Sequence, residues 1–99
     1  MAEFLDVDPR TLRLPTPRWA GADPVKLTRQ ISRFGKSTQG MPPIWVLRGA
    51  NGELMIIDGV TRATRVAKFL PGRTVRVEVT DEQLNMDYSS YPTVEDKLQ

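Results

Sequence analysis

The sequence predicts a small α/β domain of the α+β kind, with a mixed sheet of about four strands and two main helices. Its 99 residues are enough for a single core. The spacing of amphipathic helices appears over residues 24–34 and 60–70, and strand-forming residues fill 44–48, 53–57 and 74–80. These observations predict one compact domain with one functional site.

The N-terminal part predicts a short strand followed by an irregular loop. Leu5 and Val7 alternate with acidic residues, as in an edge strand. The chain from there to about Trp19 is held extended by three prolines, Pro9, Pro15 and Pro17.

The first helix has a clear start and a clear end. Asp23 is a suitable N-cap, and Pro24 suits the first helical position. Gly35 ends the helix. Its apolar positions recur at helical spacing, at Leu27, Ile31 and Phe34. The opposite face is basic, with Lys26, Arg29 and Arg33.

A hairpin and the second helix follow. The turn residues 50–52 join the strands 44–48 and 53–57, which we expect to pair antiparallel. The helix from about Val60 to Leu70 ends at a Pro-Gly pair. It directs one face to the core, through Ala63, Val66, Ala67 and Leu70, and a second stripe outward, through Thr61, Arg65 and Lys68.

The last strand and the tail complete the predicted domain. Residues 74–80 alternate valines with Arg76 and Glu78, which predicts a sheet with one solvent-exposed side. Periodicity is lost after about Asp81. We therefore predict a domain over residues 1–80 and a C-terminal tail over 81–99, either loosely ordered or strapped across the domain, with Tyr88 and Tyr91 as anchors.

Composition limits the chemistry. The chain has no Cys and no His, which excludes disulfides, thiol nucleophiles, His-based triads and the usual zinc sites. No apolar run is long enough for a membrane helix, and no secretory signal is present, so we expect no membrane partner and a cytoplasmic location. The net charge is only +2, but basic residues crowd the first part and acidic ones the tail, which suggests a basic face or simply solvated helices.

The most informative segment runs from Met55 to Arg65. An apolar strand passes through Gly59 into a helix, whose first amides have no intrahelical acceptor and lie at the positive end of the helix dipole. Gly59 allows a ligand to approach the backbone, or serves only the turn. We predict a phosphate site formed by Gly59, Val60, Thr61, Arg62 and Arg65.

Other residues have a functional and a structural interpretation. Asp58 is the acid nearest this loop in sequence, so it could hold Mg²⁺ or activate water, or it could cap the helix. Arg62 could bind phosphate or pair with Glu53 or Glu78. Trp19 could stack on a base or anchor a loop.

The order of elements over roughly residues 4–80 resembles the ParB/sulfiredoxin superfamily. Thr16-Pro17-Arg18 resembles the Gln-Pro-Arg of ParB-type domains, and residues 41–46 resemble their Pro-Ile-x-Val strand. Residues 56–67 resemble their phosphate loop and helix. The resemblance implies a site for nucleotide phosphates, with Arg18 in a loop that folds toward the nucleotide.

The loop departs from each family of this superfamily at Val60. Asp58-Gly59-Val60-Thr61-Arg62-Ala63 is closest to the Asp-Gly-His-Thr-Arg-Ala of the free-serine kinases, but it lacks their His. Sulfiredoxins have a nucleophilic Cys at this place, and ParB domains have Glu. We therefore predict a nucleotide-binding domain, with at most weak Mg²⁺-dependent phosphohydrolase activity.

Two alternatives remain open at this stage. ParB-like domains also occur as nucleases and toxin modules, and a basic set motivates DNA or RNA binding: Arg29, Arg33, Lys36, Arg62, Arg65 and Lys68. The other alternative is a regulatory domain that binds a protein partner and has lost the site. The sequence does not determine an oligomeric state.

Overall fold

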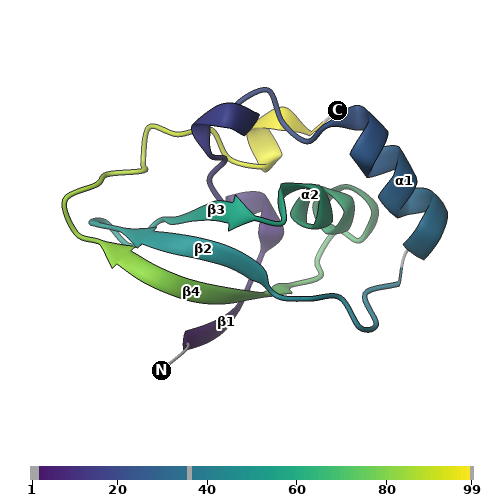
Figure 1. Ribbon diagram of the computed structural model, residues 1–99, viewed down its shortest axis with the longest axis horizontal. Coiled ribbons are helices and arrows are strands. Elements are labelled where there is room, and N and C mark those ends of the chain that lie inside the picture. Colours follow the sequence, from purple (N-terminus) through teal and green to yellow (C-terminus); the bar gives the residue numbers. More distant parts are fainter. Residues whose placement is uncertain (1–2, 36, 99) are drawn as a thin grey trace.

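A computed structural model, which describes residues 3–35 and 37–98, has one four-stranded sheet and two α-helices (Figure 1). The strand order is β1 (Glu3–Val7), β4 (Val75–Gln83), β2 (Ile44–Gly49) and β3 (Leu54–Asp58). The outer pairs are antiparallel and the central β4–β2 pair is parallel. The predicted α+β domain, with a mixed sheet and two main helices, is confirmed.

The strands lie close to their predicted positions, with one extension. β2 and β3 pair antiparallel, as their hairpin sequence predicts. β4 continues past residue 80 to Gln83, because the register shifts between Val46 and Leu47 and Gly49 then pairs with Gln83. A bulge of this kind lets a strand run on beyond the end of its alternating pattern.

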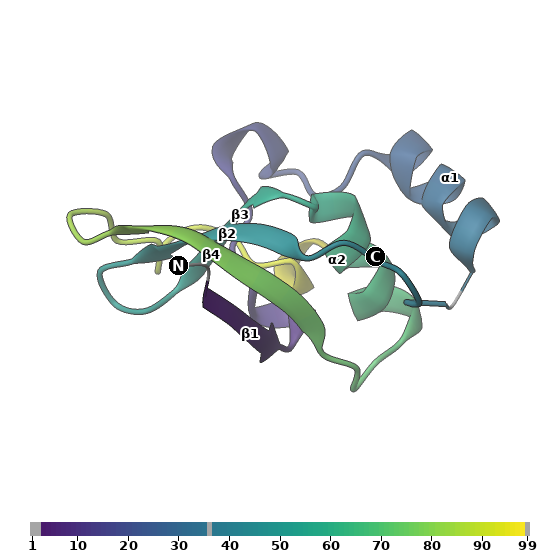
Figure 2. The ribbon, with the colours of Figure 1, turned by 60° about the horizontal axis from the view of Figure 1, so that its bottom comes forward.

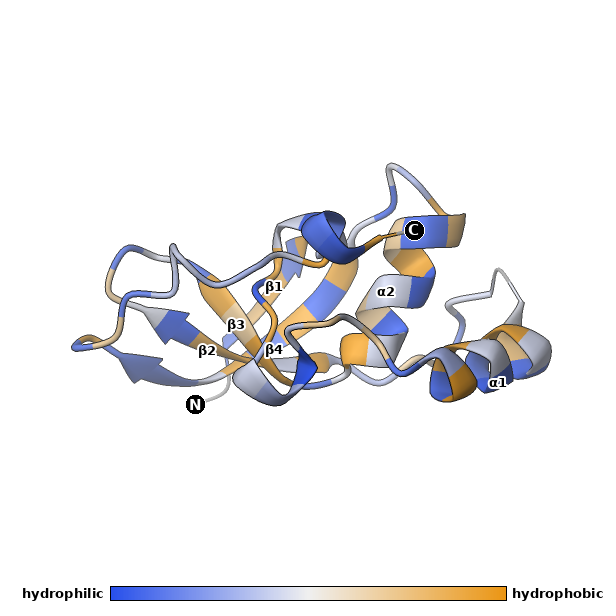
Figure 3. Cartoon of the chain, turned by 90° about the horizontal axis from the view of Figure 1, so that it is seen from above, coloured by the Kyte–Doolittle hydropathy of each residue, from blue (hydrophilic) through white to orange (hydrophobic). Residues whose placement is uncertain are grey.

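The core lies between α2 (Val60–Phe69) and one face of the sheet. The predicted apolar face of α2 is buried at Ala63, Val66 and Ala67, while Leu70 caps the helix and is half-buried. The strands contribute the other side of the core with residues that are almost fully inaccessible to solvent, namely Ile44, Val46, Ile56, Val75, Val77 and Val79. Figure 3 shows this concentration of apolar residues on the strands and α2.

Helix α1 (Pro24–Phe34) begins and ends as predicted but stands at the edge of the molecule (Figure 2). The Asp23 side chain accepts hydrogen bonds from the first amides, and Gly35 ends the helix at a φ of 57°. No residue of α1 is fully buried. Leu27 and Ile31 are half-buried against α2, and Phe34 is 41% exposed. The predicted apolar face therefore makes only a shallow contact.

The described part of the tail lies across the domain beside the proline-containing loop. The Leu14 N–H donates to the Pro92 carbonyl at 2.8 Å, and the Val94 N–H donates to the Leu12 carbonyl at 2.9 Å. Val94 and Tyr88 are buried. The Tyr88 ring occupies space that a side chain at Gly49 would fill, since a Cβ there would lie 2.6 Å from the ring.

Candidate functional site

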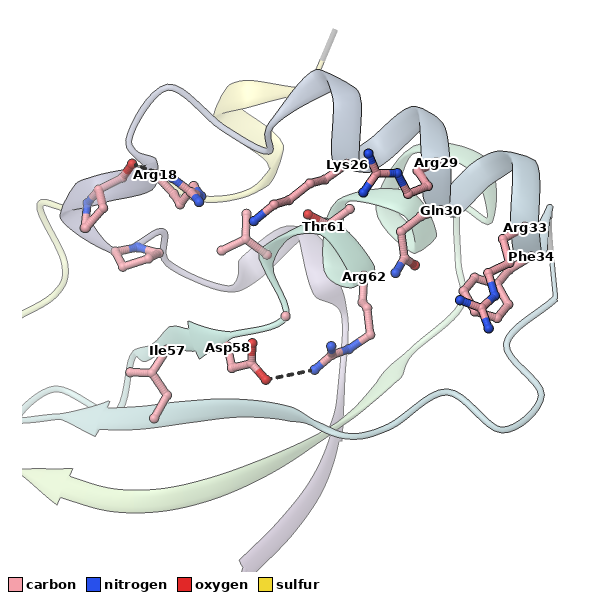
Figure 4. A pocket seen from close by; sticks show the side chains of 14 residues that line it. Arg18, Lys26, Arg29, Gln30, Arg33, Phe34, Ile57, Asp58, Thr61 and Arg62 are labelled. Atoms are coloured by element: carbon pink, nitrogen blue, oxygen red, sulfur yellow. Dashed lines mark hydrogen bonds and ion pairs between the residues drawn. The ribbon is translucent and has the colours of Figure 1, made fainter.

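A cleft of about 570 Å³ opens between α1, the start of α2, the end of β3 and the proline-containing loop (Figure 4). Five cationic side chains and one carboxylate line it, a formal net charge of +4: Arg18, Lys26, Arg29, Arg33, Arg62 and Asp58. Lys26, Arg29 and Arg33 form no ion pair within residues 3–35 and 37–98. Like charges repel when they share a site, so the cleft is suited to an anion that neutralises them.

The first turn of α2 adds backbone donors to this cleft. Gly59 is the N-cap, at a φ of 109°, and no side chain caps the helix. In the described part of the chain, the N–H groups of Val60, Thr61 and Arg62 have no acceptor. In α1, by contrast, the Asp23 side chain accepts hydrogen bonds from the first amides. Uncapped amides at the positive end of a helix dipole favour an anion.

Arg62 and Asp58 face one another across Gly59 (Figure 4). Arg62 Nη2 lies 3.6 Å from Asp58 Oδ2 and donates to the Pro43 carbonyl at 3.2 Å, while its Nε is buried without a partner among the described residues. Arg62 therefore pairs with neither Glu53 nor Glu78. Asp58 makes no hydrogen bond to the described amides of α2, so its carboxylate does not act as the helix cap.

Of the other predicted site residues, Thr61 and Arg18 have side chains in the cleft, whereas the side chain of Val60 lies in the core. Thr61 lines the cleft and is half-buried. The Val60 side chain packs into the core, at 8% exposed, so only its backbone is suited to ligand contact. Outside the loop, Arg18 lines the cleft and donates to the Pro17 carbonyl at 3.3 Å.

Two predicted ligand contacts lie away from this cleft. The Trp19 ring packs edge-on against Tyr91, with ring centres 5.3 Å apart, as a loop anchor would. Arg65 is 1% exposed, and its guanidinium donates to the carbonyls of Gly35 and Ser37. The structure gives Arg65 an internal role in place of the predicted phosphate contact.

The basic set predicted for nucleic acid is divided in the same way. Arg29, Arg33 and Arg62 line this cleft, whereas Lys68 lines a second cleft of about 600 Å³ on the other side of α1. Lys36 lies outside the described residues.

Sequence reasoning missed Gln30, which lines the cleft between the cations. Its Oε1 is buried and has no hydrogen-bond partner in the part of the chain that the structure describes. Gln30 is four residues after Lys26 and three before Arg33, so the helical spacing places it on the same face. Reading the whole polar face of α1, and not only its charges, would have found it.

Metal ligands are sparse near this site. Among residues 3–35 and 37–98, no group of three or more acidic side chains is placed to hold a metal ion. Asp58 offers one carboxylate, 61% exposed, at the mouth of the cleft. Mg²⁺ is commonly bound by one or two carboxylates together with substrate phosphates, so Asp58 fits an ion that enters with a phosphate ligand.

No model of a protein family matches the sequence, and no curated protein matches it either. In the described part of the chain, no helix has the length and apolar character needed to cross a membrane.

Proposed function

We propose that the cleft binds the phosphate groups of a nucleotide. The observation that carries this proposal is the net charge of +4 around the uncapped start of α2. The three free N–H groups of the first turn supply directional donors, and the cations of α1 and Arg62 supply charge. The resemblance of residues 56–67 to the phosphate loop of the ParB/sulfiredoxin superfamily points to the same ligand.

Asp58 is the residue that would hold Mg²⁺ carried by the phosphates. Its position beside Gly59 sets it next to the expected phosphates, and Arg62 balances its charge when no metal is bound. A bound ion could activate water for weak phosphohydrolase activity. Without an ion, the Asp58 carboxylate repels a phosphate.

The first experiment measures thermal stability and calorimetric binding with ATP, ADP, CTP, GTP and inorganic triphosphate, each with and without Mg²⁺. At about tenfold above Kd, one nucleotide should stabilise the fold by about 1.4 kcal/mol, or several degrees. Arg62→Ala should abolish this shift. The matched control is Arg73→Ala, since Arg73 is exposed and lines neither cleft, and it should keep the full shift.

A second variant tests the role of Asp58. Asp58→Asn should tighten phosphate binding without Mg²⁺, because it removes a repulsive charge, and weaken it with Mg²⁺, because it removes a ligand. A change of the same sign in both conditions would contradict metal binding by Asp58. If the wild-type protein binds none of these compounds, nucleotide binding is refuted, and a nucleic acid or a protein partner becomes the better explanation.

Binding of a nucleic-acid backbone is the second candidate, and the row of cations on α1 favours it. Lys26 and Arg33 are seven residues apart, about 10 Å along a helix, which is longer than one phosphate group. Single-stranded and duplex DNA and RNA should then bind with an affinity that falls steeply as salt rises. If Asp58 holds Mg²⁺ there, the ion could activate water against the backbone phosphate, and a cleavage assay with and without Mg²⁺ tests this nuclease activity.

A further inference from the structure

Helix α1 supplies three of the five cations of the cleft, Lys26, Arg29 and Arg33, yet it is held weakly by apolar packing. None of its residues is fully buried, and both Leu27 and Ile31 are only half-buried. These cations also repel one another and Arg62. Something other than the core must therefore fix α1 beside α2.

Arg65 makes the connection between α2 and the C-terminal end of α1. Its Nη1 donates to the Gly35 carbonyl at 3.0 Å and to the Ser37 carbonyl at 2.8 Å, and its Nη2 lies 3.6 Å from Met41 Sδ. Its guanidinium carbon also lies 5.4 Å from the centre of the Phe34 ring. One side chain thus contacts the last residue of α1, the residue that caps it and the loop that follows.

A buried arginine suits this position at the end of α1 for electrostatic and geometric reasons. Gly35 and Ser37 follow the negative end of the α1 dipole, where a cation is favourable. Both hydrogen bonds come from Nη1, whose two N–H groups lie in the guanidinium plane, so their directions are fixed, whereas an ammonium group is a rotatable point charge. Burial lowers the pKa of Arg65, so the fold carries the cost of desolvating this charge. The hydrogen bonds to the Gly35 and Ser37 carbonyls join α2 to the C-terminal end of α1.

We propose that Arg65 is a positioning residue of the cleft, which holds Arg29 and Arg33 opposite the start of α2 without touching the bound anion. This inference rests on the proposed phosphate-binding function. It predicts that anion affinity depends on Arg65 only through Arg29 and Arg33. A direct phosphate ligand would act independently of them.

A mutant cycle tests this dependence, with inorganic triphosphate as the calorimetric probe. Arg65→Met should weaken binding about tenfold in the wild-type background, the loss of one or two charge contacts. In the Arg29→Ala/Arg33→Ala background, the same substitution should have no further effect. An equal loss in both backgrounds would overturn the proposal. Arg73→Met removes the same charge from an exposed site and should leave the affinity within about twofold.

Hydrogen exchange of the ligand-free protein tests whether Arg65 holds α1 in place. In Arg65→Met, amides of residues 24–34 should exchange faster, while those of β2 and β4 keep their protection. Unchanged exchange in α1 would overturn the proposal. If the wild-type protein binds no triphosphate, the proposed function fails, and exchange still decides whether Arg65 holds α1. Should Arg65→Met not fold, Arg65→Lys keeps the charge but loses the planar guanidinium, and it should show the same two effects more weakly.

Discussion

Gly59 joins β3 to α2 with a backbone that only glycine adopts easily, so Gly59→Ala is a sensitive test of this corner. The φ of Gly59 is 109°, and a Cβ there would lie 2.9 Å from Arg62 Nη2 and 3.1 Å from Ile44 Cγ1. The first neighbour is the end of a flexible side chain. The second is a fully buried core residue, which has no free space to move into.

The expected loss has three parts. A side chain in the left-handed region costs about 1–2 kcal/mol. Displacement of the Arg62 guanidinium breaks its hydrogen bond to the Pro43 carbonyl, about 1 kcal/mol. A shift of Ile44 by a few tenths of an ångström adds up to about 1 kcal/mol. The free energy of unfolding should therefore fall by about 3 kcal/mol.

Urea unfolding measures this loss, and Gly72→Ala is the matched control. Gly72 has a φ of 88°, but nothing lies within 4 Å of the position of its Cβ. Gly72→Ala should therefore cost only the backbone part, about 1–2 kcal/mol. In an Arg62→Ala background, Gly59→Ala should cost about 1 kcal/mol less than in the wild type. Equal losses for the two glycine variants in the wild-type background would refute the reasoning.

Two further predictions concern other parts of the fold. Val94→Ala should lower the free energy of unfolding by about 2 kcal/mol, because it leaves a cavity where the tail packs on the core. Leu84→Ala, in the same tail but 73% exposed, should change it by less than about 0.5 kcal/mol. Equal effects in urea unfolding would show that the packing of Val94 adds no stability. Hydrogen bonds from Arg10 hold the pKa of the Asp8 carboxyl below its usual value. Because the folded pKa is the lower one, this stabilisation is present above the unfolded pKa and disappears as the pH falls through the folded pKa. Asp8→Asn should therefore be less stable than the wild type at pH 7. The difference should shrink as the pH falls below the usual Asp pKa of about 3.9, and a pH-independent difference would contradict this assignment.

Local signals in the sequence were sufficient for most elements. Asp23 and Gly35 marked the ends of α1, because capping and the left-handed region depend on the residue itself. The turn at residues 50–52 and the alternation of valines in β4 likewise act over a few residues. The same local rule placed Gly59 at the strand-to-helix corner, where it is the N-cap of α2.

Non-local contacts explain what the sequence did not reveal. Arg65 lies on the helical stripe between Thr61 and Lys68, and periodicity alone gives these positions the same outward orientation. Only the path of the loop after Gly35, which folds back over this stripe, buries Arg65. The shallow packing of α1 has the same origin. Its apolar spacing is that of a core helix, but the sheet is already covered by α2.

The order of the sheet also determines how the domain can assemble. β1 pairs with β4, the last strand, and β4 lies between β1 and β2. The hairpin of β2 and β3 can form from neighbouring residues, whereas β1 must wait until β4 has been synthesised. Closing so long a loop is entropically costly and slows folding. During synthesis, therefore, β1 emerges well before its partner, and Leu5 and Val7 have no strand to pair with until β4 follows.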